Sequence, residues 1–82
     1  MRYERVGQYR YGVALYEGSG TEQDLIEAWK WLALSNENGH AQSKTILLTL
    51  TRQMPAQDLR VANERKVEFV AKGKAEQLDD HE

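Results

Sequence analysis

The stretch from Gln8 to Gln42, QYRYGVALYEGSGTEQDLIEAWKWLALSNENGHAQ, decides the fold of this chain. It contains two apolar segments with helical periodicity, which the Gly-Ser-Gly at residues 18–20 separates, and Asn38-Gly39 follows the second segment. Glycine and Asn-Gly end helices because these residues readily take the left-handed conformation that caps a helix. The stretch therefore predicts two antiparallel helices joined by a short turn.

The first helix of this pair is predicted from about Tyr3 to Glu17. Its apolar side chains recur at three- and four-residue steps, as in an amphipathic helix, at Val6, Tyr9, Val13 and Tyr16. Gly7 and Gly12 lie inside the segment, and a helical glycine costs about 1 kcal/mol relative to alanine. The two glycines indicate either places where another helix backbone comes close or glycines tolerated in a marginal helix.

The second helix is predicted from about Glu22 to Asn38, with Thr21 as its N-cap. Asp24 follows Thr21 by three residues, which is a variant of the capping box. The acidic side chains of Glu22 and Asp24 also suit the positive end of the helix dipole. Capping is preferred to the alternative reading of this acidic pair as a metal site.

Apolar residues occupy most of the circumference of this second helix. Leu25, Ala28, Trp29 and Leu32 form one stripe, and Trp31 lies well round the helix from Trp29. A helix with apolar residues on most sides is buried on more than one side. Further helices of the chain, or a partner, must therefore pack on it.

Two more helices are predicted after the Asn-Gly turn. The third runs from about Ala41 to Gln53 and carries an apolar patch at Ile46, Leu47, Leu48 and Leu50. The fourth runs from about Pro55 to Lys72, and Gly73 closes it. Residues 74–82 are acidic and are expected to form a disordered tail. The predicted fold is all-α, with about four helices as two antiparallel hairpins in a single domain, residues 1–73.

The composition excludes several classes of protein. The chain of 82 residues has no cysteine, which rules out disulfides and thiolate metal sites. Its net charge is −2, and no basic stripe continues beyond Arg2, Arg5 and Arg10, which argues against nucleic-acid binding. No stretch approaches the roughly 20 apolar residues of a membrane span. The first residues show no apolar run typical of a signal peptide, so we expect a cytoplasmic protein.

The sequence shows no catalytic machinery. His40 lies at the turn between hairpins, where a turn or capping role is expected rather than a ligand or general base. His81 lies among acidic residues, which indicates either a weak metal site or a solvated acidic end. Neither histidine has a serine at readable spacing, and the carboxylates form no inward-facing pair. We therefore expect no enzyme activity, no cofactor and no metal.

The residues of the opening stretch resemble a Sel1-like repeat, a relative of the tetratricopeptide repeat. The resemblance covers one full repeat, and the spacing between the Gly-x-Gly turn, Asp24, Ala28 and Trp31 is fairly specific. The matching positions are Gln8, Tyr9, Gly12, Tyr16, Gly18, Gly20, Asp24, Ala28, Trp31, Gly39, His40 and Ala41. After Gln42 the resemblance becomes partial: a degenerate second repeat is followed by a segment, Met54 to Phe69, that is similar to the closing helix of bacterial Sel1-repeat proteins.

The resemblance implies a short α-solenoid that holds another protein and has no catalytic residues of its own. Solenoids usually need about three or more repeats to bury a continuous core, so the ends of this one are expected to be covered. Its concave surface would make Arg10 and Tyr11 partner-binding candidates. The expected function is that of an adaptor or scaffold. The alternative is a small inhibitor or immunity-type protein that masks a surface of a larger complex. A homodimer through Ile46 to Leu50 is expected if the fourth helix leaves that patch open.

Overall fold

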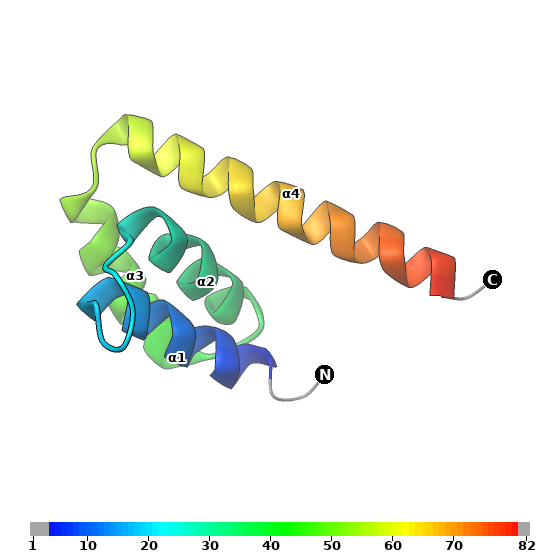
Figure 1. Cartoon of the computed structure of the whole chain (residues 1–82), viewed down its shortest axis with the longest axis horizontal. Coiled ribbons are helices and arrows are strands. Elements are labelled where there is room, and N and C mark those ends of the chain that lie inside the picture. Colours follow the sequence, from blue (N-terminus) through cyan, green and yellow to red (C-terminus); the bar gives the residue numbers. More distant parts are fainter. Residues whose placement is uncertain (1–3, 81–82) are drawn as a thin grey trace.

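Four α-helices make up residues 4–80, the part of the chain whose backbone this computed structural model describes; side chains are described for residues 7–72 (Figure 1). They are α1 (Glu4–Glu17), α2 (Leu25–Glu37), α3 (Ala41–Gln53) and α4 (Ala56–Asp80). No strand occurs within residues 4–80. The prediction of an all-α fold with about four helices is confirmed.

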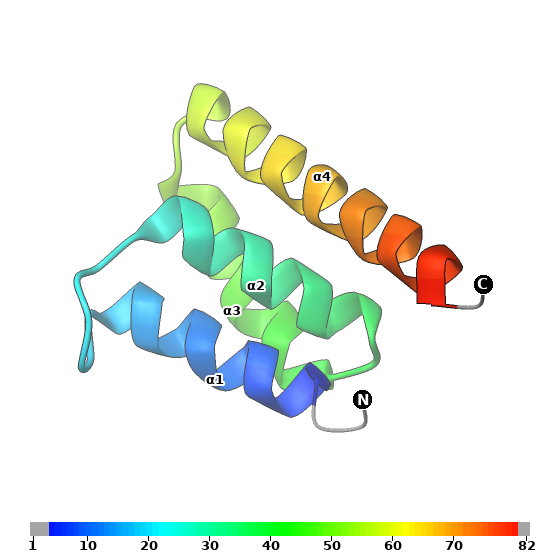
Figure 2. The ribbon, with the colours of Figure 1, turned by 45° about the vertical axis from the view of Figure 1, so that its right-hand side comes forward.

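Helix α2 is the centre of the arrangement. It packs against α1, α3 and α4, whereas α3 and α4 share few close contacts with each other. Figure 2 shows α1 and α3 running antiparallel to α2, while α4 runs in the same general direction as α2. The buried positions of α2 are Ala28, Leu32, Ala33, Leu34 and Ser35. The prediction that this helix is buried on more than one side is therefore confirmed.

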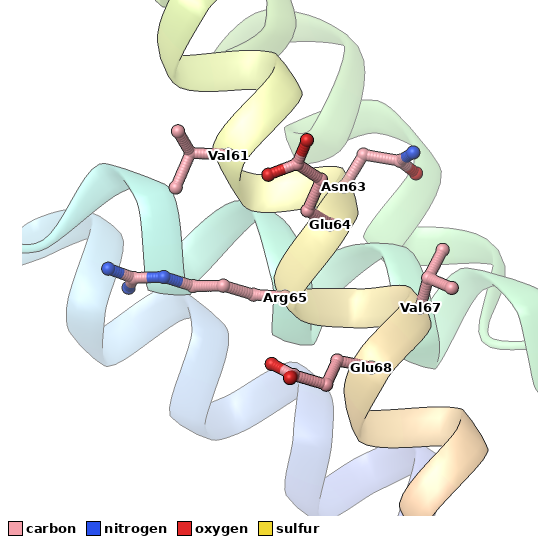
Figure 3. Close-up of a pocket in the computed structure, with 6 residues that line it drawn as sticks. All are labelled: Val61, Asn63, Glu64, Arg65, Val67 and Glu68. Carbon is pink, nitrogen blue, oxygen red and sulfur yellow. The ribbon is translucent and has the colours of Figure 1, made fainter.

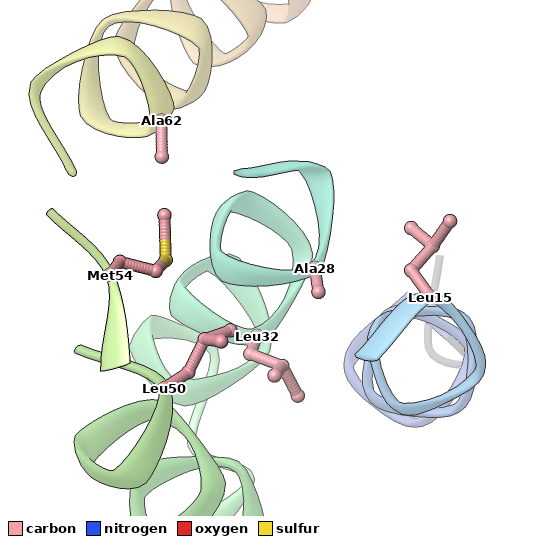
Figure 4. Close-up of a cluster of buried hydrophobic side chains, with 6 residues drawn as sticks. All are labelled: Leu15, Ala28, Leu32, Leu50, Met54 and Ala62. Carbon is pink, nitrogen blue, oxygen red and sulfur yellow. The ribbon is translucent and has the colours of Figure 1, made fainter. Parts of the chain in front are cut away.

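The hydrophobic core gathers around α2. Figure 4 shows the six side chains of the buried cluster, which come from every helix and from the connection between α3 and α4: Leu15, Ala28, Leu32, Leu50, Met54 and Ala62. Leu32 and Leu50 are fully buried. Burying a leucine completely stabilises the fold by about 1.5–3 kcal/mol. The small alanines at 28 and 62 let α1 and α4 approach α2 closely.

Gly12 marks the closest approach of α1 to α2. A Cβ atom placed on Gly12 would lie 2.8 Å from Cγ of Leu32 and 3.3 Å from its backbone nitrogen. The interpretation of this glycine as a place of close helix approach is confirmed. Gly7, by contrast, is exposed.

Glycines also make the two turns around α2. Gly18, Gly20 and Gly39 have positive φ angles of 73°, 78° and 95°, in the left-handed region that other residues rarely adopt. The amide of Gly18 donates to the carbonyl of Ala14 over 2.7 Å and so closes α1. The turn predictions at residues 18–20 and at Asn38-Gly39 are confirmed, with Asn38 as the C-cap of α2.

The start of α2 was predicted wrongly. The helix begins at Leu25 and not near Glu22, and its N-cap is Asp24, whose carboxylate accepts from the amide of Glu27 over 3.1 Å. The reason lies in two bonds to the end of α1. The Gln23 side chain donates to the Tyr16 carbonyl and the Asp24 amide donates to the Leu15 carbonyl. These bonds hold residues 23 and 24 outside the helix, so Thr21 cannot cap it.

The end of α4 also differs from the prediction. The sequence predicted that Gly73 would close the helix, but α4 continues through Gly73 to Asp80. A single helical glycine costs only about 1 kcal/mol relative to alanine. The Lys, Ala, Glu and Gln that follow it are strong helix formers. No helix in the described part of the chain is both long enough and apolar enough to cross a membrane.

Candidate functional site

The two tryptophans of α2 occupy opposite sides of the helix. The Trp29 Nε1 donates to the Thr51 hydroxyl of α3 over 3.0 Å, and the Lys66 Nζ of α4 lies 5.9 Å from the centre of the Trp29 ring. Trp29 therefore fills the space between α3 and α4. Trp31 instead faces α1 and α4, as expected from its place on the helix.

Trp31 is the middle of an aromatic cluster, which consists of Tyr11 of α1, Trp31 of α2 and Phe69 of α4. The Tyr11 and Trp31 ring centres are 5.5 Å apart at 77°, and those of Trp31 and Phe69 are 5.2 Å apart at 66°. Edge-to-face pairs of this kind contribute about 0.5–1.5 kcal/mol each beyond the burial of their area. Tyr11 remains 50% exposed and Phe69 43% exposed. About half of the surface of Tyr11, and somewhat less of that of Phe69, is thus available to a partner.

A cation lies against this cluster. The Lys30 Nζ is 4.5 Å from the centre of the Trp31 ring and 4.8 Å from that of Phe69, which is the geometry of a cation–π contact. The Lys30 side chain is only 12% exposed, and its Nζ lies 3.3 Å from a Glu27 carboxylate oxygen. The positive charge is therefore held close to the rings.

Glu27 connects this cation to α4. Its other carboxylate oxygen accepts from the Arg65 Nη1 over 2.8 Å. Partial burial of Glu27 opposes its ionisation, but the hydrogen bond from Arg65 and the charges of Lys30 and Arg65 outweigh that effect. The pKa of Glu27 consequently lies below its ordinary value. The carboxylate therefore pairs with Lys30, which lies against the aromatic cluster, and with Arg65 of α4.

The indole nitrogen of Trp31 is buried and has no hydrogen-bond partner among the described residues. A buried donor without an acceptor costs about 1–3 kcal/mol. Trp29, two residues earlier, has its acceptor in Thr51. The cluster therefore contains one unsatisfied donor next to one positive charge.

The other predicted partner-binding residue, Arg10, does not join this cluster. Arg10 is exposed, and it makes no ion pair with another side chain among residues 7–72. On a helix it points about 100° away from its neighbour Tyr11. The structure therefore separates Arg10 from Tyr11.

The remaining candidate positions lie in the framework. The Tyr9 ring stacks on the His40 ring with centres 4.4 Å apart, and His40 is the N-cap residue of α3. The turn position predicted for His40 is confirmed. Tyr16 is half-buried and Ala28 fully buried, while Ala41 is exposed at the start of α3. His81 lies outside the described residues.

Phe69 and Lys30 were not predicted as site residues. The sequence placed Phe69 only in the apolar stripe of the fourth helix. Its partner Trp31 is 38 positions earlier, and no local spacing connects them. Lys30 lies between two tryptophans in the sequence, which gives no signal by itself, and its contact with the Phe69 ring depends on the position of α4.

A shallow depression on α4 is a weaker candidate. Its lining residues all belong to that one helix: Val61, Asn63, Glu64, Arg65, Val67 and Glu68. Figure 3 shows that these side chains spread to both sides of α4, with Arg65 and Glu68 on one side and Val67 on the other. A single convex helix cannot enclose a small ligand.

Within the described residues, no group of three or more histidine, aspartate or glutamate side chains lies close enough together to hold a metal ion. Comparison of the chain with known protein families, with curated proteins and with solved structures gives no match.

Proposed function

We propose that this protein is a non-catalytic interaction module, an adaptor or scaffold that binds a protein or peptide on its helical surface. The observation that carries the proposal is the aromatic cluster. Tyr11 and Phe69 are each about half exposed and rest on Trp31, which is fixed in the framework. Aromatic side chains that are held rigidly and still reach solvent are typical anchors of protein interfaces.

The resemblance to Sel1-like repeats supports the same function. Proteins of that kind hold other proteins on stacked helix pairs, and the four-helix architecture with the Gly12 approach and the Gly18 turn is compatible with one such repeat and a closing helix. On this proposal the protein acts in the cytoplasm of a bacterium. It uses no cofactor, binds no nucleic acid and requires no membrane.

The experiment compares two variants by affinity capture from the native host. Tyr11→Ala/Phe69→Ala removes both exposed rings of the aromatic cluster, and Val67→Ala removes a similarly exposed apolar side chain that lies outside the cluster and outside the α3 patch. We expect proteins captured by the wild type to be lost with the first variant and kept with the second. Capture that is unchanged by Tyr11→Ala/Phe69→Ala, on a variant with the wild-type helical circular dichroism, would overturn the proposal.

The composition of the captured complex separates the adaptor from the alternative function. An adaptor yields complexes in which this chain joins two other proteins. An inhibitor or immunity-type protein yields one enzyme or toxin whose activity this chain abolishes when it is added back.

The proposal includes a homodimer through α3. The exposed apolar surface available for it is smaller than the sequence predicted. Leu50 of the apolar patch is fully buried, and Ile46 and Leu47 are half-buried, so Leu48 is the member that stays 51% exposed. Light scattering after gel filtration tests this part. A dimer that Leu48→Glu converts to a monomer supports it, and a wild-type monomer at high concentration contradicts it.

A further inference from the structure

We propose that Asn38 is a modification site, whose side-chain amide is converted to a carboxylate by spontaneous deamidation. A hydrogen bond to Gln8 of α1 controls the rate, and the product weakens the turn between α2 and α3. The proposal goes beyond the interaction function and does not depend on it. The observations are the Asn-Gly pair at residues 38–39, its exposure, and the hydrogen bonds that hold the turn.

The reaction takes water and needs no enzyme. The backbone nitrogen of Gly39 loses its proton and forms a bond to Cγ of Asn38, while the bond from Cγ to Nδ2 breaks and this nitrogen leaves as ammonia. Water then opens the resulting succinimide ring at either of its carbonyls. One opening gives aspartate, and the other gives isoaspartate, in which the main chain passes through Cβ and Cγ. In sum, asparagine and water become aspartate or isoaspartate and ammonia.

Asn38 is the asparagine best placed for this chemistry. Of the three asparagines in the sequence, it is the one that glycine follows. Glycine has no Cβ atom to obstruct the attack by its own nitrogen. Asn38 and Gly39 are exposed and lie outside the helices, so water reaches both. Asn36 and Asn63 precede glutamates and lie inside α2 and α4, where the following amides belong to the helix.

The folded turn holds the reacting groups apart. The amide of Gly39 donates to the carbonyl of Asn36 over 3.0 Å, and ψ of Asn38 is 8°. The attack requires that this amide be released and that ψ change until the nitrogen approaches Cγ. The leaving nitrogen, Nδ2 of Asn38, donates to Oε1 of Gln8 over 3.0 Å. The reaction therefore proceeds through local opening of the turn, and the bond to Gln8 opposes that opening.

The products change the turn in charge and in length. A carboxylate at position 38 stands at the C-terminal end of α2, next to Glu37, where the helix dipole disfavours negative charge. Isoaspartate also adds one atom to the main chain of a short turn, in which the amide of His40 donates to the carbonyl of Ser35 over 3.0 Å. Both changes are expected to make the modified protein less stable than the unmodified one.

The first experiment follows the full chain in mildly alkaline buffer. Peptides are mapped by mass spectrometry, and isoaspartate is detected with an isoaspartyl methyltransferase. We expect aspartate and isoaspartate at position 38, formed faster at higher pH because the attacking nitrogen must lose its proton, and no change at Asn36 or Asn63. A synthetic peptide of residues 35–42 should react faster, since it has no folded turn to open. An unmodified Asn38 in the folded chain, once the peptide has reacted completely, would overturn the proposal.

The second experiment tests the control by Gln8. Gln8→Met removes the acceptor oxygen and should raise the deamidation rate roughly 2- to 10-fold, the effect of losing one hydrogen bond. Gln8→Glu keeps an acceptor oxygen and should react no faster than the wild type. Gln53→Met is the matched control, because Gln53 is exposed at the far end of α3. Equal rates for Gln8→Met and Gln53→Met, with helical circular dichroism intact in both, would contradict the role of Gln8.

The third experiment measures the consequence for stability. Wild-type protein incubated until Asn38 is modified should unfold at a lower urea concentration than fresh protein. Asn38→Ser cannot react at this position, so its unfolding curve should be the same before and after the same incubation. An unchanged curve for wild-type protein with confirmed modification, or an equal shift in Asn38→Ser, would show that the modification does not weaken the turn.

Discussion

At the residue scale, Gly12 shows how one absent side chain positions a helix. Alanine at this position would put its Cβ atom 2.8 Å from Cγ of the fully buried Leu32 and 3.3 Å from its backbone nitrogen, so a buried side chain and a helix backbone would have to shift. Overpacking of this kind typically costs about 1–3 kcal/mol. The gain in helix propensity returns only about 1 kcal/mol. We therefore expect Gly12→Ala to lower the free energy of unfolding by about 1 kcal/mol.

The matched control lies in the same helix. Gly7 is exposed and helical, so Gly7→Ala should raise the free energy of unfolding by about 0.5–1 kcal/mol through helix propensity alone. Both variants are measured by urea denaturation. If Gly12→Ala stabilises the protein as much as Gly7→Ala, the close approach of α1 to α2 does not limit the size of the side chain at position 12.

The N-cap of α2 provides a second test at the residue scale. Asp24 accepts from the Glu27 amide, while Thr21 is exposed and outside the helix. Asp24→Ala should cost about 1 kcal/mol, the usual cost of a lost N-cap, and Thr21→Ala should be close to neutral. Thermal denaturation followed by circular dichroism compares them. A larger loss for Thr21→Ala would restore the prediction made from the sequence.

The same turn shows why the sequence analysis assigned the N-cap of α2 to Thr21 and not to Asp24. Thr21 and Asp24 are both good N-caps, and local propensity cannot choose between them. The choice is made by the bonds from Gln23 and Asp24 to the carbonyls of Tyr16 and Leu15, at the end of the other helix. These bonds exist only after the hairpin forms, so a local reading of residues 20–25 does not contain them.

At the element scale, the sequence was most informative about α2. Its apolar circumference predicted burial on several sides, and three helices do pack on it. The bounds of α3, Ala41–Gln53, also agree with the prediction. The predictable features are those that depend on periodicity and turn residues within one segment. The contact between Phe69 and Trp31 was not predictable, because it depends on how α4 packs on α2, and no local sequence pattern specifies that packing.

Helix α4 is held on α2 partly by charged side chains, and this makes its docking sensitive to acid. Glu27 and Glu37 of α2 pair with Arg65 and Lys66 of α4. The pKa of Glu27 is below its ordinary value of 4.5, so the ionised carboxylate contributes stability above about pH 4.5. That contribution is lost as the pH falls through the lower pKa of the folded state, when the carboxylate takes up a proton.

Glu27→Gln should therefore be less stable than the wild type at pH 7, and the difference should shrink as the pH falls below 4.5. Urea denaturation at a series of pH values measures it. In a protein that carries Arg65→Gln, the effect of Glu27→Gln on the free energy of unfolding should be smaller, because the hydrogen bond that lowers the pKa of Glu27 is already absent. A difference between wild type and Glu27→Gln that stays constant down to pH 3 would contradict the ion pair as the cause.

At the scale of the whole molecule, the arrangement is one central helix with three helices around it. Helix α4 has 25 residues and α2 has 13, so α4 continues beyond the end of α2, as Figures 1 and 2 both show. The radius of gyration is 13.1 Å, above the roughly 12 Å expected of a compact chain of this length. Because α1, α3 and α4 touch α2 far more than one another, the stability of each depends on α2.

Removing one buried side chain of α2 should consequently lower the stability of the whole molecule. Leu32 is fully buried in the core cluster, so Leu32→Ala should cost about 2–5 kcal/mol, a large part of the 5–15 kcal/mol that stabilises a typical domain. Leu48→Ala makes the same chemical change at a side chain that is 51% exposed and should stay within about 0.5 kcal/mol of wild type. Urea unfolding is followed by circular dichroism, which reports all helices, and by the fluorescence of Trp29 and Trp31, which reports α2. In Leu32→Ala the two transitions should shift together, because no outer helix has enough contacts to persist without α2. Two separated transitions would show that part of the bundle folds independently of its central helix.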